Sequence, residues 1–142
     1  MTVVAIHIGP VESGELESVE SVRAVAGQGL EGDRNFFPSG AAAGEALTLV
    51  ELEAVEDVGL PPGATRRQLT VRGVRLNDMV GKHFRVGDVE CYGVELCEPC
   101  LHLQEMTRPG LIKDLAHRGG LRADILSGGT IAVGDDVRPV AI

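Results

Sequence analysis

Short apolar stretches rich in Val and Ile recur along this sequence, and glycine bounds most of them. Runs of about four to eight such residues between turn residues are typical of β-strands. Gly-Asp pairs at 32–33, 87–88 and 134–135 favour tight turns beside several of the runs, because glycine accepts positive φ. A closed or partly closed barrel hides the edges of many short strands. The predicted strands are Val3–Ile8, Val19–Val25, Ala46–Val50, Gln68–Val71, His83–Val86, Val89–Glu95, Gly120–Leu126 and Val137–Val140.

Two helices are predicted between these strands. The first covers Leu49–Val58, where apolar residues recur every three positions and a glycine and two prolines follow. The second covers Arg108–His117, with Thr107 as its cap. Pro109 fits the first turn of that helix, and Gly119 ends it. The fold class that follows is mostly β, a distorted barrel with two or three short helices.

Composition limits the size and the partners of this fold. A chain of 142 residues suits a single domain, which we assign to residues 1–142. Aromatic residues make up only 3%, so the core must be aliphatic and aromatic stacking on bases is not expected. The formal charge of −8 repels phosphate backbones and anionic lipid, which argues against nucleic acid and membranes as partners.

The apolar run at the start and the cysteines indicate a cytoplasmic protein. Val3–Ile8 is too short for a membrane span and has no basic flank, so it is not a signal-peptide core. Cys91, Cys97 and Cys100 are an odd number within ten positions, which is a poor disulfide framework. In a reducing compartment such a cluster indicates thiol or metal chemistry.

The Cys97-Glu98-Pro99-Cys100 segment is the sharpest local motif. Pro99 fits a first helical turn, which would place Cys100 at a helix N-terminus. Unpaired backbone N–H groups and the positive end of the helix dipole favour a thiolate there. Cys100 is therefore the candidate reactive cysteine, although a free cysteine more commonly just packs in the core.

Two other interpretations of the same cysteines are open. Cys91, Cys97, Cys100 and His102 are soft or borderline ligands that suit tetrahedral zinc, in a non-catalytic binding module. All four fall within twelve residues, whereas structural zinc sites combine ligand pairs from separate segments. A redox dithiol of Cys97 and Cys100 is the other alternative, although no βαβ pattern surrounds it.

Basic residues concentrate in the second half of the chain. Six of the 13 Lys and Arg residues lie between Arg66 and Arg85, and Arg118 and Arg122 flank a glycine turn. Guanidinium groups suit bidentate binding of phosphate beside backbone N–H donors. On charge pattern alone, a solvated face that balances the acidic first half is the favoured interpretation of these residues. Histidines 7, 83, 102 and 117 give no strong signal, and the common hydrolase, protease, NTPase and dinucleotide motifs are absent.

Taken in order, six blocks of this sequence resemble the MOSC domain family, named for the C-terminal domain of molybdenum-cofactor sulfurase. Each block is weak alone, and their common order is fairly specific. The blocks cover residues 29–34, 65–71, 76–88, 98–100, 118–123 and 128–135, which is nearly the whole chain.

The resemblance implies a MOSC-type β-barrel, similar to the pyruvate-kinase-type barrel, and one important cysteine after a proline. That cysteine is Cys100, which the family pattern makes either a persulfide sulfur carrier or a thiolate ligand to molybdenum. The anionic molybdenum–pterin cofactor would then contact arginines in the matching blocks. These are Arg34, Arg66, Arg67 and Arg122.

The same resemblance implies a sulfur-donating desulfurase or an electron-transfer protein as partner. The activity would be sulfur transfer or molybdenum-dependent reduction of N-hydroxylated compounds, and the choice between carrier and enzyme stays open. Pyridoxal phosphate chemistry is not expected of these 142 residues. Two positions depart from the family pattern: Gln68 stands where relatives often have Asn, and Asn35 where many have His. Cys97 is an additional thiol.

Overall fold

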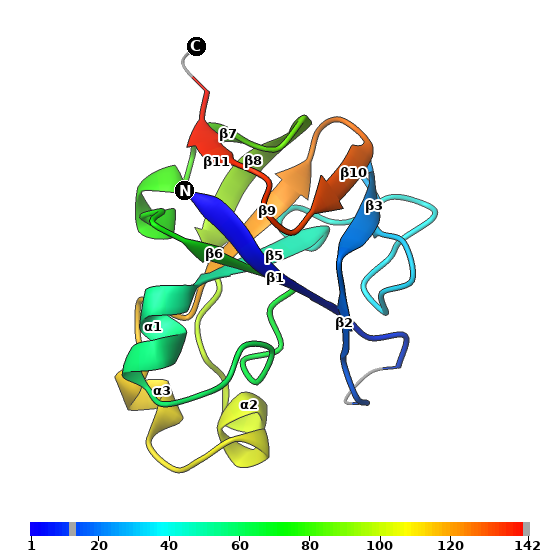
Figure 1. Ribbon diagram of the computed structural model, residues 1–142. Helices are drawn as coiled ribbons and strands as arrows, with labels where there is room; N and C mark the ends of the chain where they lie inside the picture. Colours follow the sequence, from blue (N-terminus) through cyan, green and yellow to red (C-terminus); the bar gives the residue numbers. More distant parts are fainter. Residues whose placement is uncertain (12–13, 141–142) are drawn as a thin grey trace.

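The structure of the protein is a computed structural model that describes residues 1–11 and 14–140. It contains short strands and three short α-helices, which Figure 1 shows in chain order. The strands of the first half are β1 (Thr2–Ile8), β2 (Glu17–Val19), β3 (Ser21–Val25), β4 (Gly29–Leu30), β5 (Leu47–Glu51) and β6 (Leu69–Arg72). Those of the second half are β7 (His83–Val86), β8 (Val89–Leu96), β9 (Leu121–Ile125), β10 (Gly129–Ala132) and β11 (Val137–Pro139).

The strands form two sheets. The larger sheet has the order β11-β7-β8-β9-β5-β6-β1-β2, and the smaller one has the order β10-β3-β4. Strands β5 and β6 are parallel neighbours, with Leu49 opposite Leu69, whereas the other neighbouring pairs are antiparallel. A parallel pair needs a crossover connection, and helix α1 (Leu52–Asp57) lies in it.

The larger sheet curls until β1 meets the segment that leads into β11. Val3 donates its backbone N–H to the carbonyl of Asp135 at 2.9 Å, and Gly134 donates to the carbonyl of Val3 at 2.8 Å. Thr2 and Asp136 form an antiparallel bridge at the same place. The result is a half-barrel, which confirms the predicted mostly β, distorted and partly closed barrel with short helices.

Aliphatic side chains fill the inside of the curled sheet. Along β9 the residues alternate between buried and partly exposed, with Leu121, Ala123 and Ile125 facing the core. Phe84 of β7 is the largest fully buried side chain of the described residues. The scarcity of aromatic residues therefore leaves a core of Val, Leu, Ile and Ala, as predicted.

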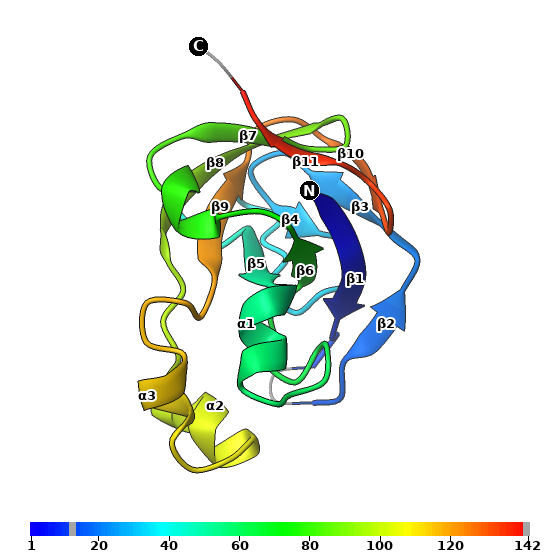
Figure 2. The same cartoon turned by 60° about the vertical axis from the view of Figure 1, so that its left-hand side comes forward.

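The three α-helices gather at one end of the barrel, as Figures 1 and 2 both show, and the short 3-10 helix Leu76–Met79 lies apart from them. A second, smaller apolar cluster lies there. Its buried members are Ala54, Val58, Leu103, Leu111 and Leu115. It packs α1 together with α2 (Leu101–Met106) and α3 (Leu111–Asp114), and so fixes α2, which carries the cysteine motif at its start. None of the helices among the described residues is long and apolar enough to cross a membrane.

The strand predictions are confirmed within about two residues, except for one run, and two further strands are present. The run Val19–Val25 is divided between β2 and β3. Gly29–Leu30 and Gly129–Ala132 are strands that were not predicted. The divided run allows β2 to pair with β1 while β3 pairs with β10 in the smaller sheet.

Both helix predictions are wrong in extent. Residues 49–51 of the first belong to β5, so the helix begins at Leu52. Of the second, only Leu111–Asp114 is helical, because Gly110 stands directly before it with φ at 83°. Thr107 does not cap that helix: its hydroxyl donates to the carbonyl of Leu103 at 2.8 Å and thereby closes the end of α2.

Candidate functional site

Cys100 is the N-cap residue of α2 and is exposed. Its backbone is extended (φ −118°, ψ 168°), and its sulfur accepts a hydrogen bond from the N–H of Leu103 at 3.4 Å. The predicted helix start at this cysteine is therefore confirmed, with the thiol acting as the cap. Pro99 was expected in the first turn, but it precedes the cap and lies outside the helix. A reachable sulfur next to a backbone donor suits a nucleophilic thiol.

The segment between Cys97 and Cys100 crosses from β8 to α2 without helical or turn structure. Cys97 is buried and donates its N–H to the carbonyl of Gly120 at 2.8 Å. Gly119 packs tightly against the same segment, since a methyl group there would lie 2.5 Å from the carbonyl oxygen of Cys97. The buried Cys97 thus anchors the segment, and the exposed Cys100 ends it.

Arg67 is the buried cation that holds this segment in place. Its Nε donates to the carbonyl of Gly119 at 2.8 Å, and its Nη1 to that of Thr65 at 3.1 Å. Its Nη2 donates to the carbonyls of Cys97 and Glu98 at 3.0 and 3.3 Å. Burial lowers the pKa of Arg67, while the nearby sulfurs of Cys97 and Cys100 act in the opposite direction.

Asp33 is the centre of a buried polar network on the other side of the site. One carboxylate oxygen accepts from the N–H of Gly9 at 2.9 Å and from Nη1 of Arg34 at 3.2 Å. The other accepts from the N–H of Asn35 at 3.1 Å and from Nε2 of Gln68 at 2.7 Å. This carboxylate therefore fixes the loop that carries Arg34.

These segments meet at a cavity of about 200 Å³, which we call the Cys100 cavity. Cys100 lines it together with all four arginines that were singled out from the sequence. The remaining lining residues are Asn35, Thr48, Cys97, His102 and Leu103. A hollow of about 170 Å³ shares Asn35, Thr48 and Arg122 with it and extends the space past Phe37.

The arginines of the Cys100 cavity differ in what else they bind. The side chain of Arg34 is 13% exposed and pairs with the buried Asp33 at 3.2 Å. Arg122 is more exposed, at 41%, and Glu95 lies 4.0 Å away with 64% of its own side chain in solvent. Such an exposed pair is weak. The cavity wall is thus cationic, and an anion is the ligand that its charge favours.

Comparison with known families decides what kind of domain this is: the MOSC domain model matches residues 41–138, more than half of the chain. The chain belongs to the MOSC domain family. MOSC domains are associated with molybdenum-cofactor biology. A comparison with curated protein sequences finds no match.

Solved structures share the fold of this MOSC domain. The YuaD protein of Bacillus subtilis has a TM-score of 0.78 at 16% identity, over 96% of this chain and 93% of its own. YiiM of Geobacillus stearothermophilus has a TM-score of 0.71 at 20% identity, over 99% of this chain and 75% of its own. YiiM of Escherichia coli has a TM-score of 0.70 at 16% identity, over 100% of this chain and 71% of its own. At these identities the likeness concerns the fold.

The zinc hypothesis is wrong for the part of this MOSC domain that the structure describes. No group of three or more His, Cys, Asp or Glu residues within 1–11 and 14–140 is arranged to hold a metal ion. Cys91 is fully buried in the apolar core on β8, and burial raises the pKa of its thiol to about 12. A zinc-binding thiolate needs the opposite environment. Cys97 and Cys100 are both free thiols that line the Cys100 cavity, and the redox dithiol of the two stays a prediction.

Sequence reasoning missed the residues that support this site. Asp33 was interpreted only as part of a Gly-Asp turn, and Gln68 only as a departure from the family pattern. In the structure Gln68 bridges two segments: its amide nitrogen donates to Asp33, and its amide oxygen accepts from the N–H of Thr48 at 2.9 Å. The signal that could have found them is their position inside the two blocks that carry Arg34, Arg66 and Arg67.

Proposed function

We propose that this MOSC domain handles sulfur at Cys100 for an anionic, pterin-type cofactor that its arginines hold. The observation that carries the proposal is the shared cavity: an exposed thiol at a helix cap opens into a space walled by Arg34, Arg66, Arg67 and Arg122. Thiol chemistry needs a reachable sulfur, and a phosphate needs guanidinium donors. Both requirements meet at this one place.

As a carrier, Cys100 takes one sulfur atom from a sulfane donor. The thiolate of Cys100 attacks the outer sulfur of a donor persulfide, R–S–SH, and forms a new S–S bond. The S–S bond of the donor breaks, and R–S⁻ leaves with the electron pair, so that Cys100 becomes a persulfide. The donor would be a desulfurase, and we expect this exchange in the reducing cytoplasm.

The residues of the Cys100 cavity fit the reacting end of a molybdenum–pterin cofactor. Cavities for drug-sized ligands measure about 300–1,000 Å³. The Cys100 cavity, at about 200 Å³, therefore fits the phosphate or the metal-bearing end, and the adjoining hollow at Arg122 extends it. When bound, such a cofactor supplies a redox-active metal. Arg34, Arg66 and Arg122 would hold its anionic group, while Arg67 holds the cysteine segment.

The same exposed sulfur favours a second role, that of a thiolate ligand to molybdenum. Cys100 would then anchor the metal directly, and an electron-transfer protein would be the partner in reducing N-hydroxylated compounds. The exposure of Cys100 at the cavity supports this role as well as the first. The two roles differ in what Cys100 carries after purification.

Intact-protein mass spectrometry after incubation with a sulfane donor tests the carrier role. We expect one added sulfur atom, which dithiothreitol removes, in the native chain and in Cys97→Ser. Cys100→Ser should stay unmodified. If the native chain gains no sulfur, or if Cys100→Ser gains as much, the carrier role is wrong.

Metal and pterin analysis of protein from molybdenum-replete cells tests the second role. Stoichiometric molybdenum in the native chain, retained in Cys97→Ser and lost in Cys100→Ser, would support ligation by Cys100. Molybdenum that persists in Cys100→Ser would exclude it. Pterin retained without the metal in Cys100→Ser would still support the arginines as the cofactor contacts.

A further inference from the structure

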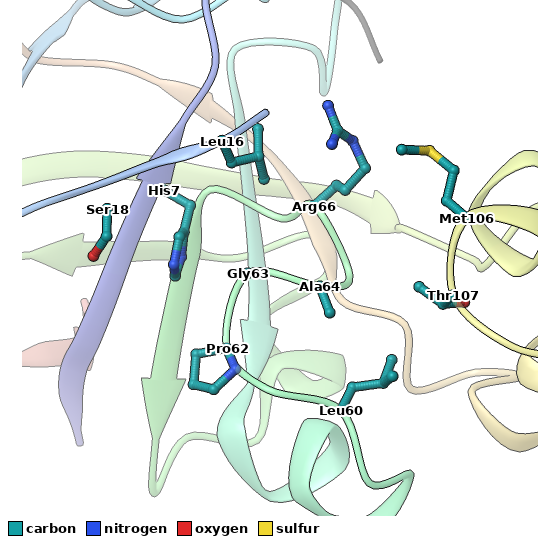
Figure 3. A pocket seen from close by; sticks show the side chains of 10 residues that line it. All are labelled: His7, Leu16, Ser18, Leu60, Pro62, Gly63, Ala64, Arg66, Met106 and Thr107. Atoms are coloured by element: carbon teal, nitrogen blue, oxygen red, sulfur yellow. The ribbon is translucent and has the colours of Figure 1, made fainter. Parts of the chain in front are cut away.

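A second cavity, of about 560 Å³, lies next to the Cys100 cavity and is not used by the proposed sulfur chemistry. We call it the Met106 cavity. Arg66 lines both cavities. Figure 3 shows His7 and Ser18 on one side of the Met106 cavity, and Met106 and Thr107 on the other.

Helix α2 connects the two cavities. Cys100 and Leu103, from its beginning, line the Cys100 cavity, and Met106 and Thr107, from its end, line the other. A helix of this length spans roughly 9 Å, at about 1.5 Å per residue. A molecule in the Met106 cavity would therefore lie within about one helix length of the reactive sulfur.

Arg66 stands at the junction in an unusual backbone conformation. Its φ is 62°, in the left-handed region that side chains other than glycine rarely adopt, and its N–H closes a turn onto the carbonyl of Gly63 at 3.0 Å. Non-glycine residues in this region cost free energy and concentrate at functional sites. The turn places the Arg66 side chain between those of Leu16 and Met106 at one margin of the cavity (Figure 3).

The rest of the lining is uncharged. Arg66 is the one charged side chain among the described lining residues, and none of them is a carboxylate. Burial lowers the pKa of His7 and so favours its neutral imidazole. Leu60 and Met106 add apolar surface, and Ser18 and Thr107 add hydroxyl groups.

Close packing at Gly63 shapes the wall beneath His7. A methyl group on Gly63 would lie 2.7 Å from Nε2 of His7, and the residue has φ at 91°. Glycine is therefore the residue that lets the turn approach the imidazole. The wall combines a preformed turn, a neutral imidazole and one cation.

We propose that the Met106 cavity binds a small organic anion, with its uncharged, partly apolar body in the cavity and its acidic group against Arg66. Such a lining matches one anionic group at one end and an uncharged body elsewhere. Binding goes beyond the proposed function and does not need Cys100.

Titration of ¹⁵N-labelled protein with phenyl phosphate, followed by two-dimensional NMR, tests this site. We expect saturable shifts of the amides of Gly63, Ala64 and Thr107, with inorganic phosphate shifting these amides far less. Arg66→Gln should weaken phenyl phosphate binding about tenfold, the equivalent of one charge-assisted hydrogen bond. Ala64→Phe, which fills the cavity, should abolish those shifts.

Two control variants separate the outcomes. Ala43→Phe fills a hollow elsewhere and should leave binding unchanged. Cys100→Ser should also bind normally, so a failed sulfur test leaves this site standing. Shifts confined to residues of the Cys100 cavity, shifts that survive Ala64→Phe, or no saturable shifts at all would overturn the proposal.

Discussion

The guanidinium of Arg67 donates a hydrogen bond from Nη2 to the backbone carbonyl of Cys97, at 3.0 Å. This contact joins the segment that leads into β6 to the segment that presents the reactive cysteine. Three further hydrogen bonds from the same side chain reach the carbonyls of Thr65, Glu98 and Gly119. One buried cation therefore determines where Cys100 stands relative to the other arginines.

We predict that Arg67→Gln destabilises the fold by about 3 kcal/mol, because several buried carbonyls lose their donors at once. Arg67→Lys should rescue little, since one ammonium cannot reach four carbonyls in these directions. Urea denaturation followed by circular dichroism measures the free energy of unfolding. Arg75→Gln, in a different hollow, is the matched control. If Arg67→Gln lowers the free energy of unfolding by less than about 0.5 kcal/mol, the Arg67 hydrogen bonds do not hold the cysteine segment as described.

Asp33→Asn should cost about 2–3 kcal/mol of stability. Both carboxylate oxygens of Asp33 accept hydrogen bonds from N–H donors. In Asn, one of these oxygens is replaced by an NH₂ group, which would face N–H donors and could accept from none of them. Asp88→Asn, at an exposed turn, should change the free energy of unfolding by less than about 0.5 kcal/mol. Equal effects of the two substitutions would show that the Asp33 network does not support the fold.

Gly119→Ala should displace the cysteine segment for steric reasons, because its methyl group would lie 2.5 Å from the Cys97 carbonyl oxygen. Overpacking of this kind costs about 1–3 kcal/mol. The amide of Leu103, which donates to the Cys100 sulfur, should shift in the NMR spectrum. Gly128→Ala meets a neighbour only at 3.3 Å and serves as the control. An unchanged Leu103 amide in folded Gly119→Ala would contradict this packing.

Cys91 should make the free energy of unfolding decrease at alkaline pH. Burial raises the pKa of its thiol from 9.0 to about 12 in the folded state, so the folded chain retains the proton more tightly than the unfolded chain. The contribution of the protonated Cys91 thiol to the free energy of unfolding is complete below pH 9. It is lost as the pH rises towards 12, by at most about 1.4 kcal/mol per pH unit. Urea denaturation between pH 8 and 11 should show a steeper decline in the native chain than in Cys91→Ala. Parallel pH profiles of the native chain and Cys91→Ala would show that the Cys91 thiol does not cause the decline.

The strands could be predicted from the sequence because each has a local signature. Residues 83–86 alternate between partly exposed and buried, and the strand that they form was predicted with its observed limits. The divided run at Val19–Val25 could not be predicted, because the division depends on two different pairing partners. Gly29–Leu30 is too short to give a pattern of its own.

The candidate site was predictable in part. The motif placed Cys100 at a helix start, and the family blocks selected arginines that the fold brings to one cavity. What could not be predicted is that Arg67 directs its hydrogen bonds into the backbone, since its partners lie about 30 and 50 positions away in the sequence. The left-handed backbone of Arg66 likewise follows from tertiary packing, because arginine does not favour that conformation.

Site-resolved alkylation of the three cysteines tests the central claim most directly. The native protein is treated with neutral iodoacetamide or anionic iodoacetate, and peptide mass spectrometry gives the rate at each cysteine. We predict that Cys100 reacts much faster than the buried Cys97 and Cys91. For Cys100, the ratio of the rate with iodoacetate to the rate with iodoacetamide should be several-fold higher than the same ratio for glutathione, because the arginines attract the carboxylate. This ratio should fall in Arg122→Gln. A Cys100 that reacts no faster than Cys97, or whose reagent preference is the same in Arg122→Gln, would contradict a reactive thiol in a cationic cavity.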